Sequence, residues 1–409
     1  MSTQQTAVSQ GRANLVLATL FLGMFVLGTA ELIVVGVLDL IAGDLRVSIP
    51  AAGTLVTAAA LGLAFGGPIL TVLTLRLNKR TILIGALVLF ILGNLVPVLT
   101  DSYGWFLTAR IITGALQGLF IATGFVTGIS VVPPEKMGRA ISAVFSGVAV
   151  SAALGVPLST LIGQALGWRG AFVAIIILSV VVLLATIAFA PSVAPAGGSA
   201  GNQAKYAFAP RVLAVLALNF AVFASLYAAL TYIVPFLQDV TGISGAAISI
   251  FLLVYGVSTV IGSGAGGRFA DKNAKATLIV ATFGTAAALL VLYLGGTVAF
   301  LVAIGILAWG LFAMGMVPSL QYRVITLAGP GGAVAQSLPA SAANIGIAFG
   351  SFIGGVAIGG GNAKATIITG FTIAVISGLI AWATSYLKPP VVEQPAAPQT
   401  DTAPDAEAA

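Results

Sequence analysis

Two residue types are missing from this chain of 409 residues, which contains no cysteine and no histidine. The lack of cysteine excludes disulfides, thiolate metal sites and cysteine nucleophiles. The lack of histidine excludes the His-Glu-x-x-His zinc site, and neither a Gly-x-Ser-x-Gly elbow nor a phosphate-binding loop occurs. Charge is scarce too, at 7% of residues against about 25% in a soluble domain. We therefore expect a membrane protein that is neither an enzyme nor an ATP-driven pump.

Apolar residues make up 59% of the chain, glycine occurs 50 times, and the mean hydropathy is +1.12. A bilayer span needs about 20 mostly apolar residues. The first apolar segment is too long for a signal peptide, so we expect it to be retained. Twelve segments fit such spans and predict an all-α polytopic membrane protein: residues 14–38, 51–73, 80–100, 104–131, 140–163, 169–190, 211–237, 245–267, 276–294, 298–323, 333–358 and 365–387.

The chain divides into two related parts. Residues 1–190 and 211–388 each hold six predicted spans, and residues 75–84 align with residues 271–280 at a constant offset of 196. The Pro-, Gly- and Ala-rich residues 191–210 predict a flexible cytoplasmic linker, and residues 389–409 a disordered cytoplasmic tail. This pattern predicts two six-helix halves related by a pseudo-two-fold axis, with a substrate site between them near the bilayer midplane.

Basic residues orient the predicted spans, because cytoplasmic loops are rich in Lys and Arg. With the N-terminus inside, the outer loops hold only Arg46, Arg169 and Lys364. We therefore expect an inner-membrane protein with both termini in the cytoplasm. The cytoplasmic basic residues are Arg12, Arg76, Lys79, Arg80, Lys136, Arg139, Lys205, Arg211, Arg268, Lys272, Lys275, Arg323 and Lys388.

Glu31 lies deep in the first predicted span, where a carboxylate costs roughly 2.5–3.5 kcal/mol. A carboxylate at this cost indicates a functional residue, which we expect to be a proton carrier. The alternative is a structural carboxyl that is hydrogen-bonded to a neighbouring helix. Arg110, in the fourth span, either tunes the proton affinity of Glu31, or snorkels outward or staples helices through backbone carbonyls. Asp39 is a further proton-coupling candidate, although it lies near the outer end of the first span, where a solvated charge costs little.

The stretches around these charges carry a family resemblance. They read GTAELIVVGVLDLIAGDL (residues 28–45), AAGTLVTAAALGLAFGGPIL (51–70), ARIITGALQG (109–118), SGVAVSAALGVPLSTLIG (146–163) and GWRGAF (167–172). The chain resembles the major facilitator superfamily, in its twelve-span drug:proton antiporter branch, and within it the arabinose-efflux and chloramphenicol-resistance permeases. The second half carries the resemblance mainly through GGRFADK (266–272).

The resemblance implies conformational roles for several residues. The family's cytoplasmic loop motif is poorly kept in the first half, where Leu75 takes its acidic position and Asn78 a glycine position. Gly267, Asp271 and Lys272 follow the motif better, which favours a latch at Asp271 over an ordinary solvated loop. The matching positions in the fourth and fifth spans are Arg110, Gly114, Gly118, Gly147, Gly155, Pro157 and Gly163, with Ser151 where the family has glycine.

The resemblance implies proton-coupled efflux of small organic molecules, such as drugs, sugars or other metabolites, by alternating access. The alternative is a proton-coupled uptake symporter for a sugar or nucleoside, and a third is a receptor that does not transport. The expected partners are substrate, protons and lipid, for a monomer with no cofactor beyond the proton gradient, no metal and no nucleic acid. We expect substrate contacts, or else helix-to-helix hydrogen bonds, from Asn219, Phe223, Tyr227, Asn344 and Gln117, of which the first three share a helix face.

Overall fold

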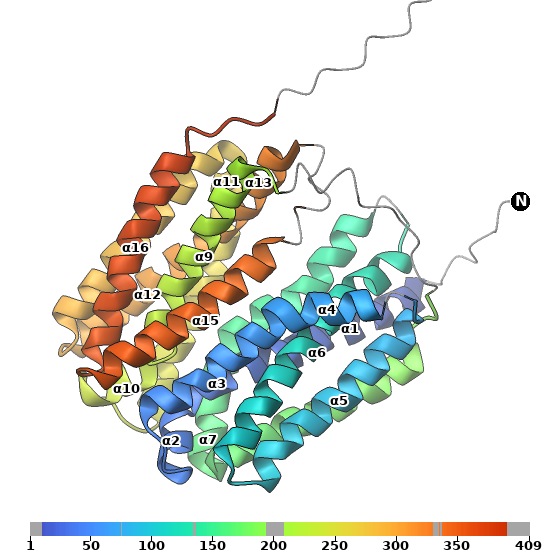
Figure 1. Cartoon of the computed structure of the whole chain (residues 1–409), viewed down its shortest axis with the longest axis horizontal. Helices are drawn as coiled ribbons and strands as arrows, with labels where there is room; N and C mark the ends of the chain where they lie inside the picture. The colour runs from blue at the N-terminus through green and yellow to red at the C-terminus, as the bar shows by residue number, and fades with distance from the viewer. Residues whose placement is uncertain are drawn as a thin grey trace, which may run out of the picture.

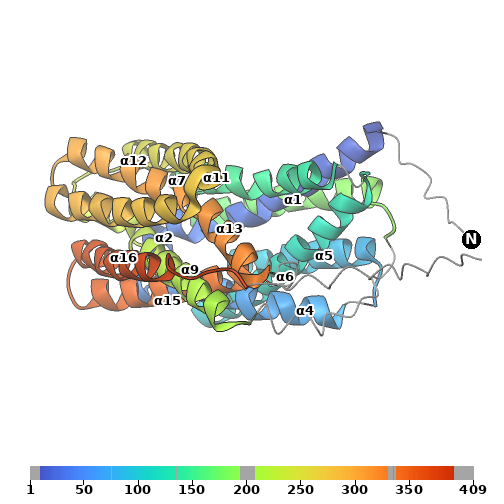
Figure 2. The same cartoon turned by 90° about the horizontal axis from the view of Figure 1, so that it is seen from above.

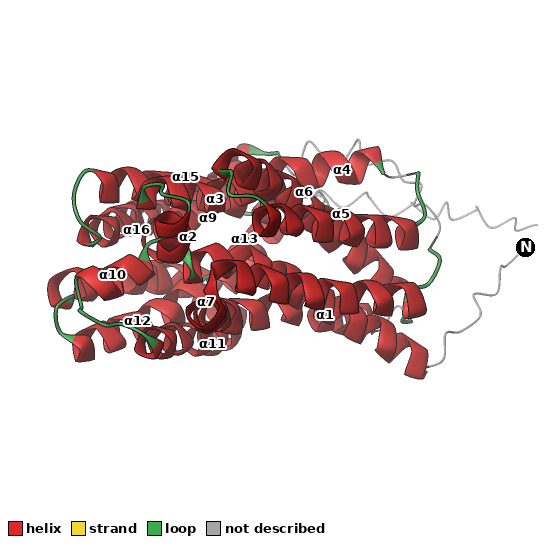
Figure 3. Cartoon of the chain, turned by 90° about the horizontal axis from the view of Figure 1, so that it is seen from below, coloured by secondary structure: helices red, strands yellow, loops and turns green. Residues whose placement is uncertain are grey.

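The computed structural model describes residues 10–390 except 75, 134–135, 194–207, 330–334 and 336–337. The regular elements of this described part are all helices (Figure 3), which confirms the all-α prediction. The first group of helices is α1 (Gln10–Gly36), α2 (Leu38–Asp44), α3 (Ile49–Leu61), η1 (Gly62–Gly66), α4 (Gly67–Leu73), α5 (Lys79–Leu99), α6 (Tyr103–Ser130) and α7 (Met137–Phe189). The second group is α9 (Pro210–Leu230), α10 (Ile233–Asp239), α11 (Ala246–Gly295), α12 (Ala299–Gly315), α13 (Val317–Ala328), α15 (Leu338–Gly359) and α16 (Lys364–Thr384).

Ten helical stretches of the described part are long and apolar enough to cross a bilayer. Two of them, α7 and α11, have 53 and 50 residues, which is about twice the length of one span. Both fold back on themselves. The first part of α7 brings Gly147 against Phe21 of α1, and its last part returns to bring Val182 beside Gly23. With two crossings in each of these helices, the structure is consistent with the twelve predicted spans.

The two reversals have different local causes. Gly167 has φ 76°, a left-handed conformation that glycine adopts without steric cost. Asn273 is extended instead, and its Oδ1 accepts a hydrogen bond of 3.1 Å from the amide of Ala276, which caps the returning helix. The eighth predicted span ends at residue 267, but α11 stays helical five residues farther, as far as Lys272. Hydropathy indicates where a helix leaves the membrane. The helix itself can continue into water, because its backbone hydrogen bonds do not depend on the membrane.

The two groups of helices lie side by side, the first in blue to green and the second in yellow-green to red (Figures 1 and 2). We call the surface where they meet the seam. Their predicted boundaries stay predictions, because residues 194–207 of the linker and 391–409 of the tail lie outside the described residues.

Three hydrogen bonds between described residues cross the seam. Thr57 of α3 donates to the carbonyl of Ala348 on α15 at 3.2 Å. The other two join Gln164 to the Gly245 carbonyl at 3.1 Å and Gln238 to Asp39 at 2.9 Å. We call the end of the bundle that holds the turns at Lys79 and Lys272 the basic end. All three hydrogen bonds lie away from it. The two groups are therefore bonded to each other toward the opposite end.

Small residues let the helices of the first group approach closely. A Cβ at Gly147 would collide with the backbone oxygen of Phe21 on α1. A Cβ at Gly114 would collide in the same way with the backbone oxygen of Ala59 on α3. Such backbone contact fixes the position of α1, which carries Glu31, between α7 and the other helices of its group.

Candidate functional site

Glu31 projects from the bilayer-crossing part of α1 and is half-buried. Its Oε2 accepts a hydrogen bond of 2.7 Å from the amide Nε2 of Gln117 on α6. Gln117 is buried, with 5% of its surface exposed. Sequence analysis placed Gln117 among the substrate contacts, and the structure brings it against the carboxylate. The other carboxylate oxygen, Oε1, forms no hydrogen bond with the described residues and can accept a proton.

Arg110 also lies beside Glu31, but on the backbone side. Its Nη1 donates to the carbonyl of Ala30 at 2.8 Å and its Nη2 to the carbonyl of Glu31 at 3.1 Å. Its Nε donates to the carbonyl of Leu55 on α3 at 3.3 Å. The guanidinium forms no ion pair with the Glu31 carboxylate. The alternative drawn from the sequence, a staple through backbone carbonyls, describes these contacts.

Helix geometry explains why Arg110 and Gln117 meet different sides of Glu31. In an α-helix the carbonyls point toward the C-terminus, whereas side chains lean toward the N-terminus. On α6, Arg110 lies near the C-terminal side of Glu31 and Gln117 lies two turns farther on. The carbonyls of α1 therefore face Arg110, and the carboxylate faces Gln117.

Tyr227 is a residue of the second group of helices that lies near Glu31 across the seam. It is buried on α9, with 7% exposure. The expected helix face also holds Asn219 and the partly buried Phe223. The Asn219 amide, however, donates to the Pro339 carbonyl at 2.6 Å and so ties α9 toward α15.

Asn344 of α15 is buried, and its Nδ2 bonds the Ala340 carbonyl of its own helix at 2.8 Å. Its Oδ1 is buried without a partner among the described residues. An unpaired amide oxygen costs free energy unless something else satisfies it. The Oδ1 of Asn344 is therefore available to accept a hydrogen bond from a substrate.

Tyr255 and Trp309 are two residues that sequence analysis missed. They lie on α11 and α12 with their rings 5.0 Å apart, and both are buried. Tyr255 Oη and Trp309 Nε1 have no hydrogen-bond partner in the described part of the chain. Their polar atoms inside apolar spans were the signal that could have found them.

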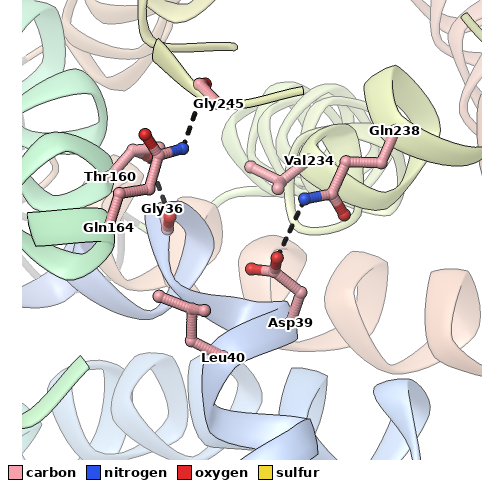
Figure 4. Close-up of a pocket in the computed structure, with 8 residues that line it drawn as sticks. All are labelled: Gly36, Asp39, Leu40, Thr160, Gln164, Val234, Gln238 and Gly245. Carbon is pink, nitrogen blue, oxygen red and sulfur yellow. Dashed lines mark hydrogen bonds between the residues drawn. The ribbon is translucent and has the colours of Figure 1, made fainter. Parts of the chain in front are cut away.

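Asp39 belongs to a separate place, on α2 beyond the end of α1. Its Oδ2 accepts a hydrogen bond of 2.9 Å from Gln238 of α10, so this acid is bonded across the seam. It lines a cavity of about 260 Å³, shown in Figure 4. The structure thus separates Asp39 from the Glu31 cluster with which it was grouped.

The residues predicted to control conformation fall into two sets. Gly147, Gly155 and Pro157 are on α7, and both glycines face α1, Gly155 with its Cβ position 3.3 Å from the Cα of Thr29. Asp271 and Lys272 are exposed at the basic end, next to the partly exposed Gly267. Asp271 pairs with no described residue in this conformation, so a latch there stays a prediction.

An ion cluster at the opposite end was not anticipated. Arg169 pairs with both Asp44 and Asp101, and Trp168 Nε1 donates to Asp44 at 3.0 Å. The hydrogen bond from Arg169, helped by that from Trp168, holds the pKa of Asp44 below its usual value. The cluster joins α2 to the reversal of α7.

The described residues contain no group of three His, Cys, Asp or Glu side chains that could bind a metal ion. The polar groups of the described residues named above near the seam include the carboxylates of Glu31 and Asp39, amides, phenols and an indole. These groups can bind an organic molecule and move a proton.

Comparison with known proteins identifies the family. The profile of the Major Facilitator Superfamily matches residues 20–338. The chain belongs to this superfamily. Its members are membrane transporters and not enzymes, and the multi-pass helical fold agrees with that assignment.

Curated relatives agree over nearly their whole length. The MFS-type transporter YtbD of Bacillus subtilis is 35% identical over 85% of this chain and 90% of its own. The inner membrane transport protein YdhP of Escherichia coli is 30% identical over 93% and 98%. The chloramphenicol resistance protein of Streptomyces lividans is 29% identical over 85% and 91%.

Solved structures show the same fold. A crystal structure of a bacterial homologue of the human lysosomal transporter Spinster, in an inward-facing and occupied conformation, matches with a TM-score of 0.74. The match covers 92% of this chain and 98% of that one at 16% identity. The likeness confirms the predicted major facilitator fold.

Proposed function

We propose that this superfamily member exports small organic molecules in exchange for protons, by alternating access at the seam. The observation that carries the proposal is the Glu31 carboxylate, which lies in a bilayer-crossing helix with one oxygen on Gln117 and the other free. A carboxylate in that position costs too much to be retained without a role. Arg110 forms no ion pair with this carboxylate, because the guanidinium donates to three backbone carbonyls and acts on the carboxylate only through its charge.

The proposed cycle uses the free oxygen. Protonation of Glu31 at Oε1 removes the charge, and release of that proton restores a carboxylate that Gln117 stabilises. The two groups of helices are bonded away from the basic end through Asp39–Gln238 and Gln164–Gly245. Those bonds must break before the seam can open at the end where they lie, away from the basic end. Substrate would contact Tyr227, Asn344, Tyr255 and Trp309, which supply unpaired polar atoms or face Glu31.

We place the basic end in the cytoplasm, because Lys and Arg concentrate in cytoplasmic loops of inner-membrane proteins. With that orientation, the seam is closed on the outer side. We further propose that one chain acts alone, since a single copy supplies both sides of the seam. Export is favoured over uptake by the chloramphenicol resistance protein among the relatives.

A growth-inhibition panel, starting with chloramphenicol, in a strain without its own efflux pumps would identify a substrate. Purified protein in oriented proteoliposomes would then be tested for substrate movement driven by a pH gradient. Glu31→Gln should abolish driven movement but keep folding, whereas Asp239→Asn, at an exposed acid of α10, should leave it intact. Normal driven export by Glu31→Gln would sink the proposal, and proton movement in the same direction as substrate would indicate an uptake symporter.

A further inference from the structure

The cavity at the opposite end of the seam has a lining unlike that around Glu31. It measures about 260 Å³, and both groups of helices contribute to it (Figure 4). It runs from the exposed Gln164 and Gly245 to the buried Val234. Its lining residues are Gly36, Asp39, Leu40, Thr160, Gln164, Val234, Gln238 and Gly245.

We infer that this cavity is a binding site for a small primary alkylammonium ion, bound by Asp39. The inference concerns a second site and does not depend on the proposed export cycle.

Asp39 gives the cavity a negative charge. Asp39 is the one formal charge in the lining, and it is partly buried. Its Oδ2 has a single neutral donor, the Gln238 amide, and no cation of the described part pairs with it. Its other oxygen points toward the space between Leu40 and Val234 (Figure 4). A partly buried carboxylate with one neutral donor is stabilised by a counter-charge.

The two amides carry the second step. Gln238 donates to a carboxylate and Gln164 donates to a backbone carbonyl, and both of these partners can only accept. The partners thus fix which end of each amide is nitrogen. Each amide oxygen is left without a hydrogen bond from the described residues. A primary ammonium has three N–H donors, of which one suits the free Asp39 oxygen and the others suit water or an amide oxygen at either side of the cavity (Figure 4).

Size and the apolar walls carry the third step. A hard metal cation needs six to eight oxygens at about 2.3–2.6 Å around it, and this lining offers few oxygens around a much larger volume. Leu40 and Val234 add hydrocarbon on two sides. An ammonium with a short alkyl chain matches both the carboxylate and these side chains. Because such an ion touches both groups of helices, binding would hold the seam closed at this end.

The test is calorimetric titration of the full chain in lipid nanodiscs with propylammonium chloride. Propan-1-ol serves as the neutral ligand of equal size, and sodium chloride matches the ionic strength. Propylammonium should bind to the wild type and raise its thermal midpoint, and propan-1-ol should do neither. Asp39→Asn preserves shape and the acceptor for Gln238, and it should weaken binding at least about tenfold.

Two more variants locate the site. Gln164→Leu, at an exposed position that should tolerate the change, should also weaken binding, whereas Glu31→Gln should bind like the wild type. The inference is overturned if the wild type does not bind propylammonium, if Asp39→Asn binds it equally well, or if sodium binds as tightly. Loss of binding in Glu31→Gln alone would overturn it too, since the amine would then bind near Glu31.

Discussion

Gln117 on α6 donates a hydrogen bond of 2.7 Å to the carboxylate of Glu31 on α1. The bond joins a buried amide to an acid within the bilayer-crossing part of the chain. It is the one hydrogen bond that the carboxylate accepts from the described residues. Gln117 therefore controls how well the charged form of Glu31 is tolerated.

Replacement of Gln117 by leucine should slow proton-driven transport without unfolding the protein. A hydrogen bond to a charged group contributes about 1.5–3 kcal/mol, so its loss should lower the rate of driven exchange roughly 10- to 100-fold. Exchange in proteoliposomes measures the change. Gln321→Leu, which removes a partly buried amide of α13 far in sequence from Glu31, is the matched control. Wild-type exchange by Gln117→Leu would show that this bond has no part in coupling.

Replacement of Arg110 by lysine should lower stability, because one ammonium cannot reach the three carbonyls that the planar guanidinium bonds. We expect a loss of about 2–3 kcal/mol, measured as a lower unfolding midpoint in detergent. Arg110 bonds the backbone carbonyl of Glu31 and acts on its carboxylate through its charge, so the effects of Arg110→Lys and Glu31→Gln should depart from additivity by about 0.5–3 kcal/mol. Additive effects of the two changes would show that Arg110 does not act on the Glu31 side chain.

The sequence predicted the helical fold well because the bilayer imposes it. A span must be long, apolar and helical to satisfy its backbone in lipid, and those demands are visible in composition alone. The same logic found Glu31 and Arg110, since a charge in such a segment is conspicuous. It ended the eighth span at residue 267, short of the helix, because helix and membrane do not end at the same residue.

The partners of these charges could not be predicted. Which side of Glu31 meets Gln117 depends on the register between α1 and α6, and a single sequence does not fix that register. The contact of Asp39 with Gln238 joins positions 199 residues apart. Tyr255 and Trp309 carry polar atoms that mark them within apolar spans, but only the structure shows that these atoms lack partners among the described residues.

Replacement of Gly147 by alanine should force α7 away from α1. The added Cβ would collide with the backbone of α1, which cannot yield as a flexible side chain does. Overpacking of this kind costs about 1–3 kcal/mol, seen as a lower thermal midpoint. Gly264→Ala on α11 is the matched control, because nothing lies within 4 Å of its Cβ position. Equal midpoints for the two variants would contradict the close packing.

The carboxyl of Asp44 should titrate below the ordinary aspartate value of about 3.9, because Arg169 and Trp168 donate to its charged form and lower its pKa. The stabilisation that these hydrogen bonds contribute is complete above that ordinary value. It is lost as the pH falls through the lower pKa of the folded protein. NMR titration of the ¹³C-labelled Asp44 carboxyl would measure its pKa.

Arg169→Leu should return the pKa of Asp44 toward its ordinary value, since it removes the larger of the two causes. Trp168→Phe should produce a smaller shift in the same direction, because it removes only the indole donor and keeps an aromatic ring beside Phe106 and Phe172. If Asp44 titrated identically in the wild type and in Arg169→Leu, the ion cluster would not form in solution. The join between α2 and the reversal of α7 would then rest on apolar packing alone.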